Sequence, residues 1–146
     1  MFGSQLRGVR AYEDTGVETG VMNADPHQLV LMLFEGARLA VGKAMFAMEQ
    51  GNISNKGMCV SRAISIINEG LSQSLSWEAN PQMADRLSSL YEYMEYRLTQ
   101  ANLHNDRGML LEVDRLLAEL ETAWKAITPE RRQKPVGLTS LKTAVV

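Results

Sequence analysis

The chain has 146 residues, of which 45% are hydrophobic and 22% are charged, and its formal net charge is −2. This length is typical of a single domain, and the charge balance gives no reason to expect a nucleic-acid-binding protein. No run of about 18 apolar residues without charges occurs, so we expect no transmembrane helix and no membrane insertion.

Residues 1–24 form a distinct N-terminal segment in which apolar residues are separated by polar residues and by three glycines. The apolar residues are Leu6, Val9, Tyr12, Val17 and Val21. The segment lacks the basic region and apolar core of a secretion signal. Five spaced apolar side chains favour a loosely docked lid, helical or extended, over a frayed terminus.

Asp25-Pro26 is a strong helix start, since an aspartate caps free backbone amides and proline suits the first helical position. A stripe with helical spacing follows, and Gly51 is placed to end the helix in a left-handed conformation. The stripe consists of Leu29, Leu33, Ala37, Ala40, Ala44 and Met48, widened by Val30, Phe34, Val41 and Met45.

After a polar joint at 52–55, three further stripes predict three more helices. Asn80-Pro81 repeats the pattern of the first helix start, and Asp106 is the expected cap of the fourth helix, after a joint at 103–107. The second stripe is Val60, Ile64, Ile67, Leu71 and Leu75, with Ala63 and Ile66 at its edges. The third is Met83, Leu87, Leu90, Met94, Leu98 and Ala101, and the fourth is Leu110, Val113, Leu117, Leu120, Trp124 and Ile127.

Short joints between amphipathic helices of similar length predict an all-α fold, an antiparallel up-down-up-down four-helix bundle. We assign residues 1–127 to this domain, with 1–24 as its lid. Residues 128–146 have two prolines, no periodicity and, from four basic residues and one acidic residue, a formal charge of +3. This composition predicts a disordered basic tail; a basic docking arm is the alternative.

The residues do not predict an enzyme. The two histidines, His27 and His104, lie in a first helical turn and in a joint, and no Glu-x-x-His pair exists, so we expect neither a metal nor a cofactor. Cys59 is the single cysteine; it excludes an internal disulfide, fits a reducing cytoplasm and is expected to be a buried apolar residue.

Several apolar residues lie beside the stripes and exceed what a bundle core requires. They are Ile66, Tyr91, Tyr93, Tyr96, Leu111 and Leu116. One interpretation is a wide core with tyrosine hydroxyls reaching water; the other is a groove that accepts a helix or strand of a partner. The residues alone leave both open.

The chain resembles the FliS-type flagellar secretion chaperones. The resemblance covers about residues 9–127 and rests on the order and spacing of several short segments. These are Ala11-Tyr12 before Val17-Glu18-Thr19; 24–30 leading into 32–37; Ala63-Ile64 with Ile66-Ile67 and Glu69; 90–94 with Arg97-Leu98; Ala101-Asn102; and Glu112-Val113 before Leu116-Leu117. Asp25 replaces the serine expected at the first cap, and Tyr96 replaces a usual arginine.

The resemblance implies a cytoplasmic export chaperone without catalytic activity. Members of this family bind the disordered C-terminal segment of flagellin, prevent its premature polymerisation and assist its delivery to the flagellar type III export apparatus. The family is also tied to the export gate protein and, in some members, to an anti-sigma factor; a regulator acting mainly on an anti-sigma factor is the alternative function. Whether the chain forms a homodimer stays open.

The resemblance also implies partner-binding residues. Val9 and Tyr12 match the N-terminal functional motif of the family, and Tyr91, Tyr93 and Asn102 match the third-helix motif. Ile66 is added because it flanks its stripe. We expect the N-terminal segment to occupy part of the groove and to move when the client arrives.

Overall fold

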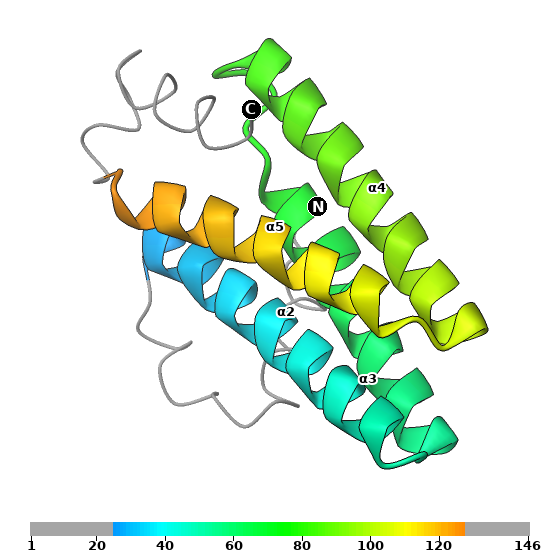
Figure 1. The fold of residues 1–146 in the computed structure, drawn as a ribbon. Helices are drawn as coiled ribbons and strands as arrows, with labels where there is room; N and C mark the ends of the chain where they lie inside the picture. The colour runs from blue at the N-terminus through cyan, green and yellow to red at the C-terminus, as the bar shows by residue number, and fades with distance from the viewer. Residues whose placement is uncertain (1–24, 128–146) are drawn as a thin grey trace.

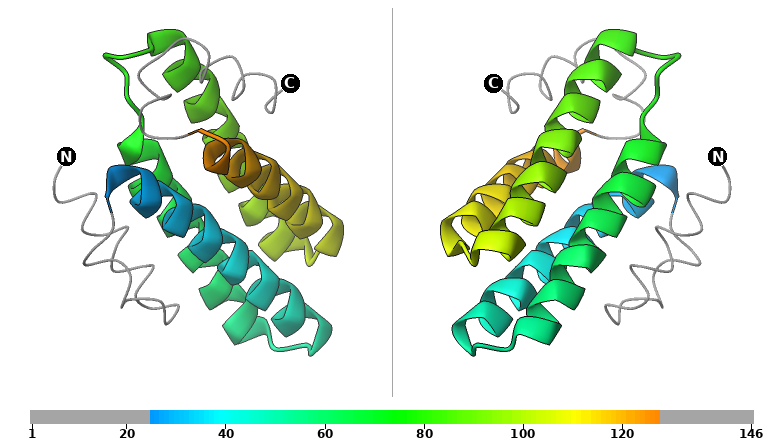
Figure 2. Two further views of the ribbon diagram at one scale, coloured as in Figure 1. Left: turned by 90° about the vertical axis from the view of Figure 1, so that its left-hand side faces the viewer. Right: turned by 90° about the vertical axis from the view of Figure 1, so that its right-hand side faces the viewer.

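The computed structural model describes residues 25–127, which form the predicted all-α four-helix bundle (Figure 1). The helices are α2 (Pro26–Glu49), α3 (Ile53–Ser65), α4 (Pro81–His104) and α5 (Arg107–Lys125). A π-helical turn, η2 (Ile66–Leu71), and a 3-10 turn, η3 (Ser72–Ser74), extend α3. Consecutive helices run in opposite directions, and each packs against the next, while α5 returns to α2 (Figures 1 and 2).

The predicted helix starts are confirmed by hydrogen bonds from backbone amides to side-chain caps. Asp25 accepts from the amide of Gln28 at 2.8 Å, and Asn80 and Asp106 make equivalent bonds at 3.1 and 3.2 Å. Gly51, with a φ of 70°, follows the end of α2 as predicted. Each of these signals is local, because it depends on residues within one helical turn.

Two end signals were not predicted, and both are asparagines. Asn52 caps α3 by accepting from the amide of Asn55 at 3.1 Å. Asn105 ends α4 in the left-handed region with a φ of 53°, a conformation that asparagine tolerates better than most residues. Together they make the two joints at this end of the bundle short and well defined.

The buried face of the second helix is wider than the predicted stripe. Ala63 and Ile66, predicted at its edges, are fully buried, whereas Ile64 is only half-buried. In a π-turn each residue rotates by a smaller angle about the helix axis than in an α-helix. The neighbours Ile66 and Ile67 therefore both face the core. Within this turn Gly70 has no side chain, which leaves room for Leu33 of α2.

Five of the six residues in the predicted stripe of the third helix are buried, and only Leu90 differs. Tyr91 is buried, although it was predicted beside the stripe, and Leu90 is only half-buried. Tyr91 lies at the end of the bundle where α2 starts and α5 ends. There Tyr91 packs near Phe34, Leu120 and Trp124, and these large side chains leave a void of about 30 Å³.

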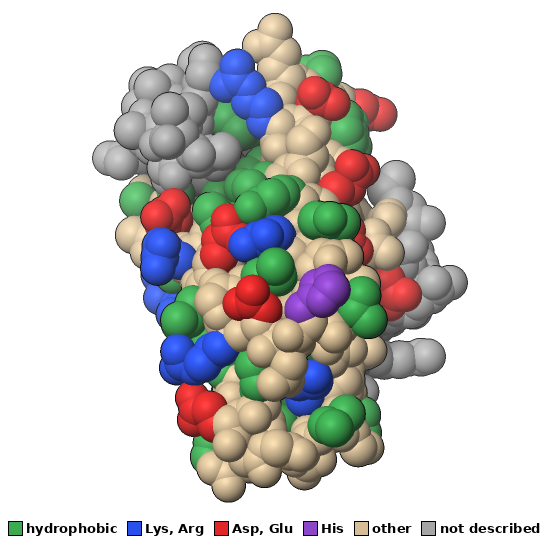
Figure 3. Space-filling view, turned by 45° about the vertical axis from the view of Figure 1, so that its right-hand side comes forward, with side chains coloured by type: hydrophobic (Ala, Val, Ile, Leu, Met, Phe, Trp, Pro, Cys, Tyr) green, Lys and Arg blue, Asp and Glu red, His purple; other side chains and the backbone are tan. Residues whose placement is uncertain are grey.

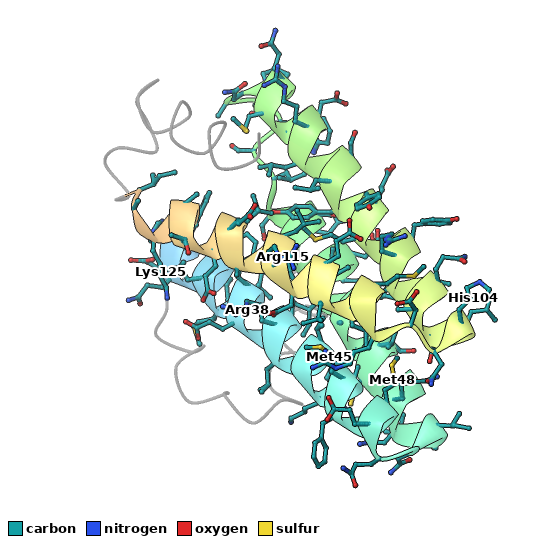
Figure 4. All side chains as sticks on the ribbon, viewed as in Figure 1. Arg38, Met45, Met48, His104, Arg115 and Lys125 are labelled. Carbon is teal, nitrogen blue, oxygen red and sulfur yellow. The ribbon has the colours of Figure 1, made fainter. Side chains whose placement is uncertain are left out.

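The seam between α2 and α5 is closed by charges as well as by apolar packing. Arg38 lies between the two helices (Figure 4), and its guanidinium donates to Asp114 at 3.0 Å and to Glu121 at 2.9 Å. Glu121 is buried, and Lys125 lies 3.7 Å from its second carboxylate oxygen. At the start of α2, the His27 ring stacks on Trp124 with centroids 5.3 Å apart. None of the helices in residues 25–127 is long and apolar enough to cross a membrane.

Candidate partner-binding groove

An open groove of about 800 Å³ lies between α3 and the C-terminal end of α4. Its rim and floor combine apolar side chains, small side chains and two cations. The lining residues are Ile53, Ser54, Lys56, Gly57, Met58, Ser61, Arg62, Ser65, Asn102 and Leu103. No carboxylate is among them.

The apolar residues of the groove are unusually exposed. Ile53 is 75% exposed, Leu103 is 71% exposed and Met58 is 58% exposed. Single exposed apolar residues are common on protein surfaces, but three around one concave surface are typical of a binding site. The groove can therefore gain apolar burial from a partner that fills it.

Lys56 fixes the two walls of the groove relative to one another. Its ammonium group donates to the backbone carbonyl of Asn102 and to Oδ1 of Asn105, each at 3.0 Å, and its side chain is buried. The ammonium thus lies at the C-terminal end of α4, where the helix dipole favours a cation. Nearby, a Cβ built on Gly57 would lie 4.0 Å from the amide nitrogen of Asn102, so the two helices approach closely there.

The predicted site residues within residues 25–127 fall in three different places. Asn102 lines the groove, whereas Ile66 and Tyr91 lie in the core. Tyr93 is exposed on the other side of α4, where it faces α5. Val9 and Tyr12 lie outside the described residues, so their role, like that of the whole predicted lid, stays a prediction.

Tyr93 belongs to a polar cluster that joins α4 to α5. Its hydroxyl donates to one carboxylate oxygen of Glu112 at 2.6 Å, and the guanidinium of Arg97 donates to the other, also at 2.6 Å. The hydrogen bond from Tyr93, followed by that from Arg97, lowers the pKa of Glu112. The same bond raises the pKa of the Tyr93 phenol, because it favours the protonated hydroxyl. Burial alone raises the pKa of the Tyr91 phenol.

The other residues predicted beside the stripes are divided between surface and core. Tyr96 and Leu111 are exposed, and Leu116 is half-buried and packs against the core. Hydrophobic side chains are scattered among charged ones over the face that carries α4 (Figure 3). The wide-core interpretation therefore applies to Ile66, Tyr91 and Leu116, whereas none of the six residues lines the groove.

The sequence analysis did not identify Ile53, Met58 and Leu103 as site residues. Ile53 and Leu103 lie within the two predicted polar joints, where an apolar residue without periodicity carries no signal. Met58 lies on the face of α3 opposite the stripe. An apolar residue on a face expected to be in solvent was the signal that could have identified it.

The groove holds no arrangement typical of catalysis. Its two titratable residues, Lys56 and Arg62, are both cations, and no group of three or more potential metal ligands exists in the described part of the chain. Cys59 is buried, as predicted. The fold and this surface place the chain in the class of all-α bundles with an open, partly apolar groove.

Comparison with known proteins identifies the family within that class. Residues 8–131 match the family model described as flagellar protein FliS. A flagellar secretion chaperone FliS from Salmonella typhimurium is 46% identical over 84% of this chain and 91% of its own length. Those from Escherichia coli and Bacillus subtilis are 42% and 34% identical, over 89% and 85% of this chain and 97% and 89% of their own lengths. The chain therefore belongs to the FliS family of flagellar secretion chaperones.

Proposed function

We propose that this chain binds the disordered C-terminal segment of flagellin, keeps it from polymerising early and assists its delivery to the flagellar type III export apparatus. The observation that carries the proposal is the groove between α3 and α4, with exposed Ile53, Met58 and Leu103 on its rim. A chaperone that masks an aggregation-prone segment needs such a surface, because it covers the client's apolar residues by non-covalent contact alone.

The energetic requirement supports an apolar groove of this size. A disordered segment that folds on binding costs about 2–5 kcal/mol in ordering, which only extended apolar contact offsets. An amphipathic helix that lays its apolar face into a groove is one of the recurring ways to make such contact. The export gate protein and an anti-sigma factor remain predicted further partners, and a homodimer stays open.

A substitution at the rim of the groove tests the proposal. Leu103→Asp places a charge where the client's apolar face would lie, and we expect the Kd for a flagellin C-terminal peptide to rise by roughly 30-fold, as loss of a hot-spot contact of about 2 kcal/mol does. Isothermal titration calorimetry measures the change. Circular dichroism checks that the variant keeps its helical content.

Phe46→Asp is the matched control. Phe46 is 62% exposed on α2 and does not line the groove, so the same change in chemistry there is expected to leave the Kd within about twofold. An unchanged Kd for Leu103→Asp contradicts the proposal. Equal losses in both variants would mean that binding depends on general surface hydrophobicity instead of the groove.

A further inference from the structure

Lys56 is a buried cation at the end of the bundle where α3 begins and α4 ends. Only 5% of the residue is exposed, and its ammonium donates to two oxygens of α4, the carbonyl of Asn102 and Oδ1 of Asn105. No carboxylate within residues 25–127 forms an ion pair with it. A buried ammonium without a carboxylate is costly to remove from water, so apolar packing alone does not account for a lysine at this position.

The last turn of α4 receives from Lys56 a hydrogen bond that the helix itself does not supply. The amides of Asn105 and Asp106 both donate to the carbonyl of Ala101. The next carbonyl, that of Asn102, is one of the four at a helix end that lack an intrahelical donor, and it accepts from Lys56 instead. Two bonds from one side chain of α3 therefore hold the C-terminal turn of α4.

The bond to Asn102 also sets the position of Leu103, its neighbour in the groove. The carbonyl of Asn102 and the amide of Leu103 belong to one planar peptide unit, so fixing the carbonyl fixes the backbone from which the Leu103 side chain projects. Leu103 is the exposed apolar residue that α4 contributes to the groove, and Ile53 and Met58 belong to α3. The spacing between these apolar groups thus depends on how firmly the end of α4 is held.

We infer that Lys56 is a positioning residue for the client site: it holds the last turn of α4 so that Leu103 stays at the distance from α3 that the client requires. The inference rests on the proposed function. Lys56 acts from below the surface, through the backbone of Asn102, and not by touching the client. A surface that is already fixed in the free protein loses less conformational freedom on binding, so removing the two bonds lowers the affinity.

The variant Lys56→Met tests the inference, because it removes both bonds and keeps a long unbranched side chain. We expect the Kd for the flagellin C-terminal peptide to rise by about fivefold, measured by isothermal titration calorimetry. Lys56→Arg restores donors for both oxygens of α4, and its Kd should return to within about twofold of the original. Equal losses in the two variants would assign the effect to side-chain shape and overturn the inference.

Arg107→Met is the matched control. Arg107 begins α5 at the same end of the bundle, and its guanidinium donates to Glu49 of α2 at 3.0 Å, so it too joins two helices. Neither residue lines the groove. We expect the Kd of Arg107→Met to stay within about twofold of the original. A loss equal to that of Lys56→Met would mean that affinity follows any loosening of this end of the bundle, which contradicts a specific role for Lys56.

Amide hydrogen exchange in the free protein, followed by NMR, tests the positioning step without the client. In Lys56→Met we expect the amides of Asn105 and Asp106 to exchange about fivefold faster. The amides of Gln50 and Asn52, which are bonded at the end of α2, should be unchanged. Equal acceleration at all four amides would indicate general destabilisation and contradict the inference.

A second variant reaches the same contact from α4. Asn105→Gly removes one of the two acceptors and keeps the left-handed backbone, since glycine adopts a φ of 53° without strain. We expect it to raise the Kd less than Lys56→Met does. A folded Asn105→Gly with unchanged exchange at Asp106 and unchanged Kd would count against the inference even if Lys56→Met failed to fold.

The outcomes separate this inference from the proposed function. If Lys56→Met binds the peptide like the original protein while Leu103→Asp loses affinity, the groove binds the client and the role of Lys56 is wrong. If Leu103→Asp binds normally, the groove is not the client site, and the proposed function fails there together with the inference.

Discussion

The seam between α2 and α5 and the groove between α3 and α4 are built from different interactions. At the seam, Arg38 forms two ion pairs across the helices, one with buried Glu121, and the helices pack along much of their length. At the groove, the walls are joined where Lys56 bonds to Asn102 and Asn105, and large apolar residues remain in water. One side of the bundle is therefore completed within the chain, whereas the other leaves large apolar side chains exposed around an open groove.

This difference separates stability from binding. Side chains in the core and at the seam between α2 and α5 exchange water for protein contacts on folding, so their loss lowers the free energy of unfolding. Side chains of the groove stay hydrated in the free protein, so we expect their loss to have little effect on folding and, under the proposed function, a large effect on association. Substitutions at three sites outside the groove test how far this separation holds.

The largest effect is expected from Ile66→Ala in the core. Ile66 is fully buried beside Ile67 and Leu71, and the cavity left by truncation should lower the free energy of unfolding by about 2–5 kcal/mol. Urea unfolding followed by circular dichroism measures it. Leu103→Ala is the control from the groove and should change stability by less than about 0.5 kcal/mol.

The milder variant Ile66→Val addresses the predicted contact of Ile66 with a partner. It should cost about 1 kcal/mol of stability and leave most of the protein folded, so the affinity for the flagellin peptide can be read directly. Unchanged affinity identifies Ile66 as a core residue only. A marked loss of affinity would mean that the client reaches below the surface of the free protein.

An intermediate effect is expected from Arg38→Met at the seam. The change keeps much of the side-chain volume but leaves buried Glu121 with Lys125 alone, at 3.7 Å. Because Arg38 is partly exposed to water, we expect a loss of about 2 kcal/mol in the free energy of unfolding. The double variant Arg38→Met/Glu121→Leu should recover part of it, and no recovery would contradict the assigned ion pair.

The smallest effect is expected from Glu112→Gln in the polar cluster of Tyr93 and Arg97. The side chains of Arg97 and Glu112 are partly exposed, at 28% and 33%, so the loss near pH 7 should be at most about 1 kcal/mol. The pKa of Glu112 is lowered in the folded protein from a usual 4.5, so its contribution is present above that value and is lost as pH falls through the folded pKa.

A pH series of unfolding measurements tests this sign. The difference in unfolding free energy between the original protein and Glu112→Gln should shrink as the pH falls below about 4. Glu119→Gln, an exposed glutamate on the same helix, should show no comparable change. A difference that grows toward acid would contradict the hydrogen-bond assignment.

Sequence signals predicted the helices better than the site. Asp25, Asn80 and Asp106 were recognised as caps because a cap acts on amides within one turn. Asn102 was predicted through resemblance and does line the groove, but its neighbours there come from a different helix. Ile53 and Leu103 stand 50 residues apart in the sequence, and no periodic pattern relates them.

The sequence by itself determined that this protein is a bundle of four capped, amphipathic helices, because helix ends and stripes depend on residues a few positions apart. Only the tertiary structure decided which side chains complete the core and which remain exposed around the groove. Most residues of the predicted stripes are buried, and Ile66 in the π-turn and Tyr91 on α4 join them in the core. Burial depends on what lies across the helix interface, and a single helix carries no information about its neighbour's surface.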